Sequence, residues 1–143
     1  MIEIIPLKDA SQIVTFMNIE DNIEDIIDGT KLEWIQYLCK VVKSEKYLIA
    51  AVLVDKILKG YFVCFDDVDP PLSSSITLFY ISELRDIVDS EGKEVSKKII
   101  IFLKKWAKIR GAKRIEGLTR YPLLAKEFGF KVRKNIKAIT MEI

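Results

Sequence analysis

The sequence predicts one mixed α/β domain, a mixed sheet with helices, that extends over residues 1–143. Three observations lead to this prediction. The chain is 50% hydrophobic and 31% charged, the balance of a chain that folds around a core. No repeat or low-complexity stretch divides it. Its hydrophobic pattern changes between strand and helix periods in the order β-α-α-β-β-β-α-β-α-β, which excludes a helical bundle and a β-sandwich.

The first third of the chain predicts a short strand followed by two helices. Residues 4–6 are typical of a strand that proline ends. Residues 8–11 open the first helix, and Thr30 caps the second, with Glu33 three residues on in capping-box position. The inward faces are Ile13, Phe16 and Met17 in the first helix and Trp34, Leu38, Val41 and Val42 in the second.

The middle of the chain predicts three strands. Residues 47–54 are nearly all apolar, and residues 59–65 are rich in aromatic and β-branched side chains. The polar pair Asp55-Lys56 joins these strands as a short turn, so we expect an antiparallel hairpin. A loop at residues 66–71 follows, because it ends in two prolines, and residues 75–84 form the third strand.

The last third predicts a long helix and then smaller elements. The helix extends from Gly92 to Gly111, with Val95, Ile99, Phe102, Leu103 and Trp106 on its apolar stripe. Residues 114–118 form a strand, and a short helix opens at Pro122 and ends before Gly129. Residues 132–143 supply a final strand or two.

The residue types exclude several classes of chemistry. Histidine is absent, so the chain has no His-activated nucleophile, no His general base and no His-ligated metal, and we expect no metal site. We interpret Cys39 and Cys64 as small hydrophobic core residues. No apolar run approaches the roughly 18 residues that span a bilayer, and the start resembles no signal peptide. We therefore expect a cytoplasmic protein without membrane contact.

Four segments occur in a specific order and spacing. They are the hairpin at residues 54–61 with a glycine after its turn, the strand and loop of residues 83–96, the helix end at Ala107 and Gly111, and the Gly-Phe ending of residues 126–130. In this order they resemble the GCN5-related N-acetyltransferase (GNAT) family over essentially the whole chain. The resemblance implies a GNAT-like acyl-CoA N-acyltransferase fold and acetyl-CoA as the cofactor.

The resemblance also assigns a cofactor segment. In the family, a loop ahead of the central helix offers backbone N–H groups to the pyrophosphate of the cofactor. The sequence pattern of this loop is Gln or Arg, two residues of any type, Gly, one residue of any type, and Gly or Ala. Here Glu91 replaces the basic or amide residue and Glu94 replaces the first glycine, whereas Ser96 is suitably small. The predicted cofactor-binding residues are Glu91, Gly92, Lys93, Glu94, Val95, Ser96 and Lys97.

The two carboxylates of this segment oppose an anionic ligand. At ~5 Å and an effective dielectric constant of ~20, each pair of unit charges repels by ~3 kcal/mol. Lys93 and Lys97 offset part of this repulsion. Two alternatives stay open. In the first, the segment has lost its ligand and stabilises the helix, because Glu94 interacts favourably with the helix dipole. In the second, the alignment to the family pattern shifts by one residue, and Gly92 takes the place of the family's glycine.

Two residues are candidates for proton transfer by resemblance. Many family members use a carboxylate base on the strand before the loop and a tyrosine in the closing helix as acid. Glu83 lies near the end of that strand. At the usual tyrosine position this chain has Ala125, and Tyr121, one turn earlier, is the replacement. The alternatives are a surface carboxylate for Glu83 and a packing role for Tyr121.

Charge is distributed unequally along the chain. Residues 1–91 hold 8 of the 23 basic and 17 of the 21 acidic side chains, so the remainder is strongly basic. We interpret the basic helix first as a solvated face, second as a partner of cofactor phosphates and third as a nucleic-acid contact. Nucleic acid is not expected, because no helix-turn-helix or zinc pattern accompanies the lysines. Salt bridges to the acidic half, within one chain or across a homodimer, are a further alternative.

The predicted function follows from the resemblance. It is direct transfer of an acetyl group from acetyl-CoA to a primary amine of a small molecule or peptide, with strand N–H groups polarising the thioester carbonyl in a splayed sheet. The alternative is a catalytically inactive GNAT-fold protein that binds another ligand or a protein partner. The ending from Arg120 to Phe130 is similar to reduced acetyltransferase-like proteins of phage and prophage genomes.

Overall fold

The computed structural model describes residues 1–17, 19, 21–81, 90–118, 126, 129–133 and 139–142. Its elements are β1 (Ile2–Pro6), α1 (Ala10–Phe16), the 3-10 helix η1 (Ile23–Asp25), α2 (Lys31–Val41), β2 (Tyr47–Val54), β3 (Ile57–Asp66), β4 (Ser75–Ile81), α3 (Ser90–Ile109) and β5 (Arg114–Glu116). The predicted mixed α/β class and the order of the elements up to β5 are confirmed.

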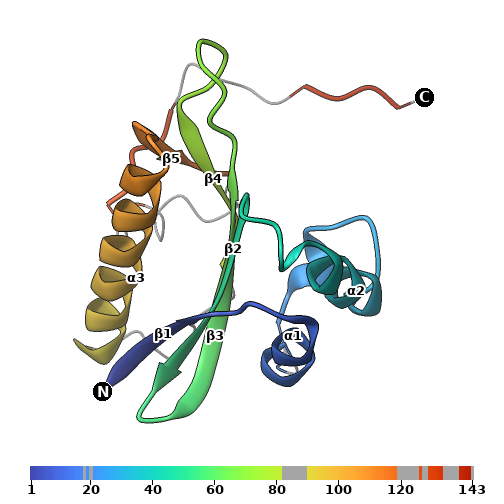
Figure 1. The fold of residues 1–143 in the computed structure, drawn as a ribbon, viewed down its shortest axis with the longest axis vertical. Helices are drawn as coiled ribbons and strands as arrows, with labels where there is room; N and C mark the ends of the chain where they lie inside the picture. The colour runs from blue at the N-terminus through green and yellow to red at the C-terminus, as the bar shows by residue number, and fades with distance from the viewer. Residues whose placement is uncertain are drawn as a thin grey trace.

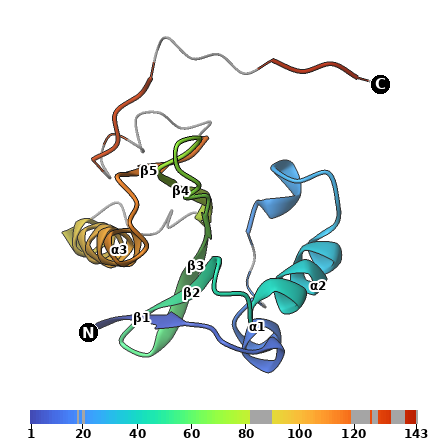
Figure 2. The ribbon, with the colours of Figure 1, turned by 45° about the horizontal axis from the view of Figure 1, so that its top comes forward.

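The five strands form one sheet in the order β1-β2-β3-β4-β5. The first three neighbouring pairs are antiparallel, and β4 and β5 are parallel. A parallel neighbour requires a crossover connection, which α3 supplies. Figure 1 shows the long helix α3 beside one face of the sheet and α1 with α2 beside the other. Figure 2, in a second orientation, shows the same division.

Each face of the sheet carries its own hydrophobic core. Under α1 and α2, the buried residues include Ile13, Leu38 and Tyr61, which are at most 1% exposed. Under α3, Phe62 and Ile99 are 0% exposed. Neighbouring strand residues such as Tyr61 and Phe62 therefore point into different cores, as the period of two in a strand requires.

Local signals in the sequence end the elements as predicted. Thr30 and Glu33 form a complete capping box at the start of α2. Asp55 and Lys56 form the two-residue hairpin turn, with φ values of 49° and 67°. Positive φ at both turn residues matches the right-handed twist of the flanking strands. Strand β3 begins directly after this turn, at Ile57, two residues earlier than predicted.

The structure corrects the predicted bounds of later elements. Helix α3 begins at Ser90 and not at Gly92, and β5 ends at Glu116 and not at residue 118. The described part of the predicted final strand, residues 132–133 and 139–142, has no strand structure, and Ile139 and Met141 are 95% and 86% exposed. Most of the predicted closing helix lies outside the described residues.

Two searches concern only the described part of the chain. In that part, no helix has the length and the apolar character that crossing a membrane would need. Nor do three His, Cys, Asp or Glu side chains of that part come together in a way that could hold a metal ion. Cys64 is buried and Cys39 is only partly buried, and both are free thiols.

Candidate functional site

The parallel strands β4 and β5 diverge after a short ladder. They pair only from Ser75 with Arg114 to Thr77 with Glu116, although β4 continues to Ile81. Beyond Thr77, no described residue of β5 pairs with β4, which continues for four residues, or ~13 Å at ~3.3 Å per residue. An extended ligand can add to a strand edge of this kind.

A close backbone contact lies at the point of divergence. A Cβ atom placed on Gly117 would lie 2.8 Å from the carbonyl oxygen of Leu78. Real Cβ atoms essentially never come this close to another heavy atom, and a backbone carbonyl cannot move aside cheaply. Only glycine therefore allows the chain leaving β5 to pass β4 at this distance. Gly117 is therefore the residue that lets the two chains touch here without a clash.

Strand β4 also carries an irregularity close to this point. Tyr80 pairs with Val63 and Leu78 pairs with Cys64, so Phe79 is an extra residue on β4. Such a bulge bends a strand and redirects its side chains. Tyr80 is consequently buried on the α2 face, while Phe79 stays 48% exposed, with its ring 5.6 Å from that of Trp34. The bulge thus lies beside the open edge of β4.

A hydrogen-bonded network joins β3 to the segment before α2. The indole N–H of Trp34 donates to the Tyr61 hydroxyl at 3.1 Å, and this hydroxyl donates to the Asp21 carboxylate at 2.8 Å. The Asp21 side chain is 1% exposed. It also accepts the Ile23 backbone N–H and lies 3.7 Å from the Lys31 ammonium. These partners hold a carboxylate that burial alone would destabilise.

Burial and the nearby Asp21 carboxylate raise the pKa of Tyr61 far above its ordinary value. Burial is the largest cause of the raised pKa, because an ionised hydroxyl would be poorly solvated at this site. Asp21 adds to the effect, because ionisation would place a second negative charge beside its carboxylate. The hydroxyl therefore stays protonated and acts as a hydrogen-bond donor. Its role is to hold Asp21 and not to exchange protons at neutral pH.

An acidic hollow of about 440 Å³ opens beside this network. Its lining holds three carboxylates and one ammonium group. The Tyr80 hydroxyl donates to the Asn22 side-chain oxygen at 2.9 Å, so the hollow is tied to β4 close to its bulge. A cationic group would find complementary charge here. The residues that line the hollow are Asp21, Asn22, Glu24, Asp25 and Lys31.

The predicted cofactor segment, residues 91–97, lies inside α3 and not in a loop ahead of it. In the described part of α3, which starts at Ser90, the N–H groups of residues 90–92 have no acceptor four residues back. The N–H groups of residues 94–96 face carbonyls four residues back. Anion binding by the backbone is therefore confined to the first turn of α3.

The side chains of that segment point in different directions. Lys93, Glu94 and Lys97 are exposed and Ser96 is partly buried. Val95 is 0% exposed and packs in the core beneath α3, so its side chain cannot contact a ligand. The side chain of Glu91 and the exposure of Gly92 lie outside the described part, as do Glu83 and Tyr121 entirely. Their predicted roles stay predictions.

Sequence reasoning missed the residues that shape this region. Gly117 stands inside a predicted strand, and an isolated glycine there is a known signal of close backbone approach. Asp21 lies in an acidic stretch that reads as solvated, because nothing local shows that its carboxylate is buried. Tyr61 and Tyr80 read as ordinary strand residues, since their hydroxyl partners are 40 and 58 positions away.

Comparisons with known proteins give matches in structure only. No protein-family model matches the chain, and no curated protein matches its sequence. The aminoglycoside antibiotic 6'-N-acetyltransferase AAC(6')-Ih from Acinetobacter baumannii has a TM-score of 0.75 at 12% identity, over 100% of this chain and 99% of its own. AAC(6')-Iy, solved with the bisubstrate analog CoA-S-monomethyl-acetylneamine, has a TM-score of 0.74 at 12% identity, with the same coverage.

A third solved structure has a different acceptor in its name. The ribosomal-protein-alanine N-acetyltransferase from Brucella melitensis biovar Abortus 2308 has a TM-score of 0.70 at 15% identity, over 100% of both chains. Identities this low show a common fold, and a fold hosts more than one function. The three structures agree in architecture with the sheet and helices described above.

Proposed function

From the premise that this chain has the fold of the GCN5-related N-acetyltransferases, we propose that it transfers an acetyl group from acetyl-CoA to a primary amine. The observation that carries the proposal is the divergence of β4 and β5 at Gly117 and Leu78. It opens a strand edge inside a sheet, where an extended ligand can pair with backbone groups. In this chain β4 continues as a strand along the opening, which the fold alone does not require.

The open edge of β4 suits the thioester arm of acetyl-CoA. Acetyl-CoA would supply an activated acetyl group. The residues of β4 beyond Thr77 would pair with the arm through N–H and C=O groups, as a strand pairs with its neighbour. A β4 N–H directed at the thioester carbonyl would stabilise negative charge developing on its oxygen. Gly117 allows the chain leaving β5 to contact the Leu78 carbonyl at the point where β4 and β5 stop pairing.

The start of α3 suits the phosphates. The free N–H groups of residues 90–92 and the positive end of the helix dipole attract anions. Lys93 and Lys97 are exposed one turn apart and add two positive charges. Glu94 opposes them, since its carboxylate is exposed within the same turn. Glu91 opposes an anion as well, so the two lysines and the N-terminus of the helix offset these two carboxylates.

The acidic hollow supports a cationic acceptor. Amines are protonated at neutral pH, and the carboxylates of Glu24 and Asp25 would attract such a group to the α2 face of β4. One proton must leave the ammonium group before its nitrogen attacks the acetyl carbon. We assign this proton transfer to Glu83 and the protonation of the departing thiolate to Tyr121, as the resemblance implies.

Titration with acetyl-CoA tests the proposal. We expect a dissociation constant in the micromolar range by calorimetry. At a free concentration of 100 times that constant, the protein gains about 2.7 kcal/mol of stability, which raises its melting temperature. Desulfo-CoA is the matched control for the thioester, and transfer to a polyamine panel measures activity. If millimolar acetyl-CoA neither binds nor raises the melting temperature, the proposal is wrong.

One observation favours a second function. Glu94 stands near the start of α3 in the place where the family has a glycine, and its side chain is exposed. A chain that has lost its cofactor gains helix stability from this residue. The second candidate is thus an inactive GNAT-fold protein that binds another ligand or a protein partner. Absence of acetyl-CoA binding in the titration above would favour it.

A further inference from the structure

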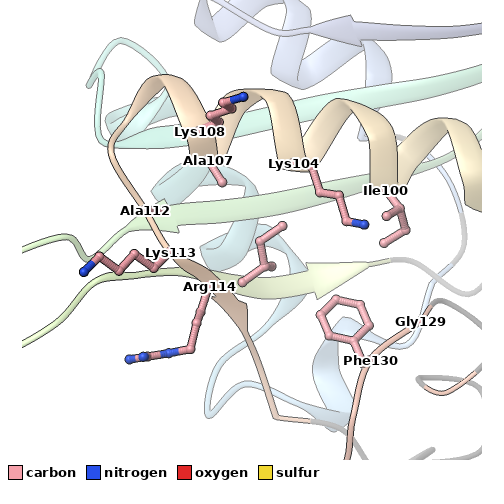
Figure 3. A pocket seen from close by; sticks show the side chains of 10 residues that line it. Ile100, Lys104, Ala107, Lys108, Ala112, Lys113, Arg114, Gly129 and Phe130 are labelled. Atoms are coloured by element: carbon pink, nitrogen blue, oxygen red, sulfur yellow. The ribbon is translucent and has the colours of Figure 1, made fainter.

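A second cavity lies between the C-terminal half of α3 and the start of β5, as Figure 3 shows. Its volume is about 430 Å³, within the range of roughly 300–1,000 Å³ that is common for small-molecule sites. Apolar side chains form its interior. Ala107 comes from α3, Ile115 from β5 and Phe130 from the segment that follows Gly129. The cavity therefore offers an apolar surface and one aromatic ring to a ligand.

Positive charge surrounds this apolar surface. Lys104 and Lys108 come from α3, Arg114 is the first residue of β5 and Lys113 directly precedes it. None of the described residues that line the cavity is acidic. In Figure 3 the Lys104 side chain extends from α3 toward the side on which Phe130 lies, while Lys113 and Arg114 extend outward at the other rim. Four cations thus border one cavity.

Most of these cations have no counter-charge of their own. In the part of the chain that the structure describes, no carboxylate lies within 4.0 Å of the ammonium groups of Lys104, Lys108 or Lys113. Arg114 is held by Glu116 at 2.9 Å. The negative end of the α3 dipole amounts to about half a charge and offsets only a small part of this excess. Among the described residues that line the cavity, positive charge is therefore in excess.

The cavity is distinct from the start of α3. Lys104 follows Ser90 by 14 residues, which corresponds to ~21 Å along a helix that rises 1.5 Å per residue. It is also distinct from the other lysines of the same helix. Lys98 and Lys105 are exposed but do not line the cavity. These two residues provide a control for charge on α3 in general.

We propose that this cavity binds a small ligand that carries two or more negative charges on an apolar ring system, the chemistry of a nucleoside phosphate. The charges would lie at the rim with Lys104 and Lys113, and the ring would pack on Phe130 and Ile115. A cavity of this volume, open to solvent between a helix and a strand, suits one nucleotide. It is too small for a nucleic-acid duplex, which would need an extended surface.

Calorimetric titration of the full chain with ADP at low salt tests the proposal. We expect saturable binding of one ADP per chain. The double variant Lys104→Glu/Lys113→Glu should weaken it at least tenfold, since each reversal turns an attraction for the phosphates into a repulsion. The control Lys98→Glu/Lys105→Glu carries the same change in net charge and should alter it less than twofold. Equal weakening by both double variants would show unspecific charge attraction and overturn the proposal.

Two further titrations distinguish a separate nucleotide site from the cofactor site and from a nucleic-acid surface. ADP binding that is unchanged by saturating acetyl-CoA supports a separate site, whereas competition between the two places ADP at the cofactor site and overturns the proposal. A short single-stranded oligonucleotide that binds much more tightly than ADP, with affinity rising with length, identifies a nucleic-acid surface and also overturns it. No ADP binding at low salt has the same consequence.

This proposal stands or falls separately from the acetyltransferase proposal. If acetyl-CoA fails to bind but ADP binds in a way that depends on Lys104 and Lys113, the cavity is confirmed and the acetyltransferase proposal is wrong. If acetyl-CoA binds and the Lys104→Glu/Lys113→Glu variant binds ADP as the wild type does, the reverse holds. Circular dichroism of both double variants checks that they are folded, which substitutions of these exposed lysines should not prevent.

Discussion

The Tyr61 hydroxyl on β3 donates a hydrogen bond of 2.8 Å to the Asp21 carboxylate, whose side chain is 1% exposed. This bond joins a strand at the centre of the sheet to the segment that lines the acidic hollow. The ring of Tyr61 lies 5.3 Å from that of Tyr80, which holds the neighbouring Asn22. Two adjacent tyrosines thus fix the wall of the proposed acceptor side relative to β4.

Removing this hydroxyl should lower stability. The Tyr61→Phe variant leaves the buried Asp21 carboxylate with one donor fewer and the Trp34 indole N–H without its acceptor. We expect a loss of about 1–3 kcal/mol in the free energy of unfolding, because buried polar groups are left unsatisfied. Urea unfolding measures it. Tyr37→Phe is the control, since its hydroxyl bond to Tyr47 is exposed. Equal losses in the two variants would contradict the role of burial.

The same tyrosine predicts a pH dependence. Burial and Asp21 raise the pKa of Tyr61 in the folded chain, while in the unfolded chain it is near the ordinary value of about 10. A raised folded pKa contributes stability that is fully present below pH ~10 and is lost as pH rises further. The difference in unfolding free energy between the wild type and Tyr61→Phe should therefore narrow from pH 9 to pH 11. A constant difference would refute the assignment.

The start of α2 depends on one side chain. Thr30 accepts the Glu33 backbone N–H, and Glu33 in return accepts the Thr30 backbone N–H. We expect Thr30→Ala to lower the unfolding free energy by about 1 kcal/mol, the usual cost of a lost N-cap. Thr30→Ser keeps the accepting oxygen and should stay within a few tenths of the wild type in chemical denaturation. If Ser is as destabilising as Ala, the cap does not explain the effect.

The divergence of β4 and β5 depends on a missing side chain. In Gly117→Ala the new Cβ would meet the Leu78 carbonyl at 2.8 Å, so one backbone must move. We expect a loss of about 1–3 kcal/mol in stability and weaker acetyl-CoA binding, because overpacking shifts the edge that the thioester arm needs. Gly29→Ala is the control, since its Cβ would meet only the Glu33 side chain, at 3.4 Å. Unchanged binding by Gly117→Ala would show that the edge is not used.

Two substitutions of Glu94 test whether its charge or its bulk opposes binding of the cofactor. Glu94→Gln removes the charge and keeps a side chain, whereas Glu94→Gly removes both and costs about 1 kcal/mol of helix stability. If charge is the obstacle, both variants should bind acetyl-CoA several-fold more tightly in calorimetry. If the side chain itself blocks the ligand, only Glu94→Gly gains affinity. No gain in either variant would mean that Glu94 does not face the cofactor.

Much of the fold follows from local patterns. The capping box at Thr30, the turn at Asp55-Lys56 and the stripe that buries Val95 and Ile99 were all readable, because caps, turns and helical periods involve residues a few positions apart. The family resemblance predicted the architecture that the solved acetyltransferases share. The predicted start of α3 differs from the observed start by two residues, since Ser90 and Glu91 carry no apolar side chain that would mark the helix.

The sequence by itself determined the class of fold, the order of its elements and the unequal distribution of charge, because composition and periodicity are properties of the chain alone. Only the tertiary structure decided which distant groups meet. Gly117 came to lie against Leu78, and Asp21 became a buried partner of Tyr61, 40 positions away. Such contacts arise from the packing of a whole sheet between two helix layers, in which each strand's position depends on all the others.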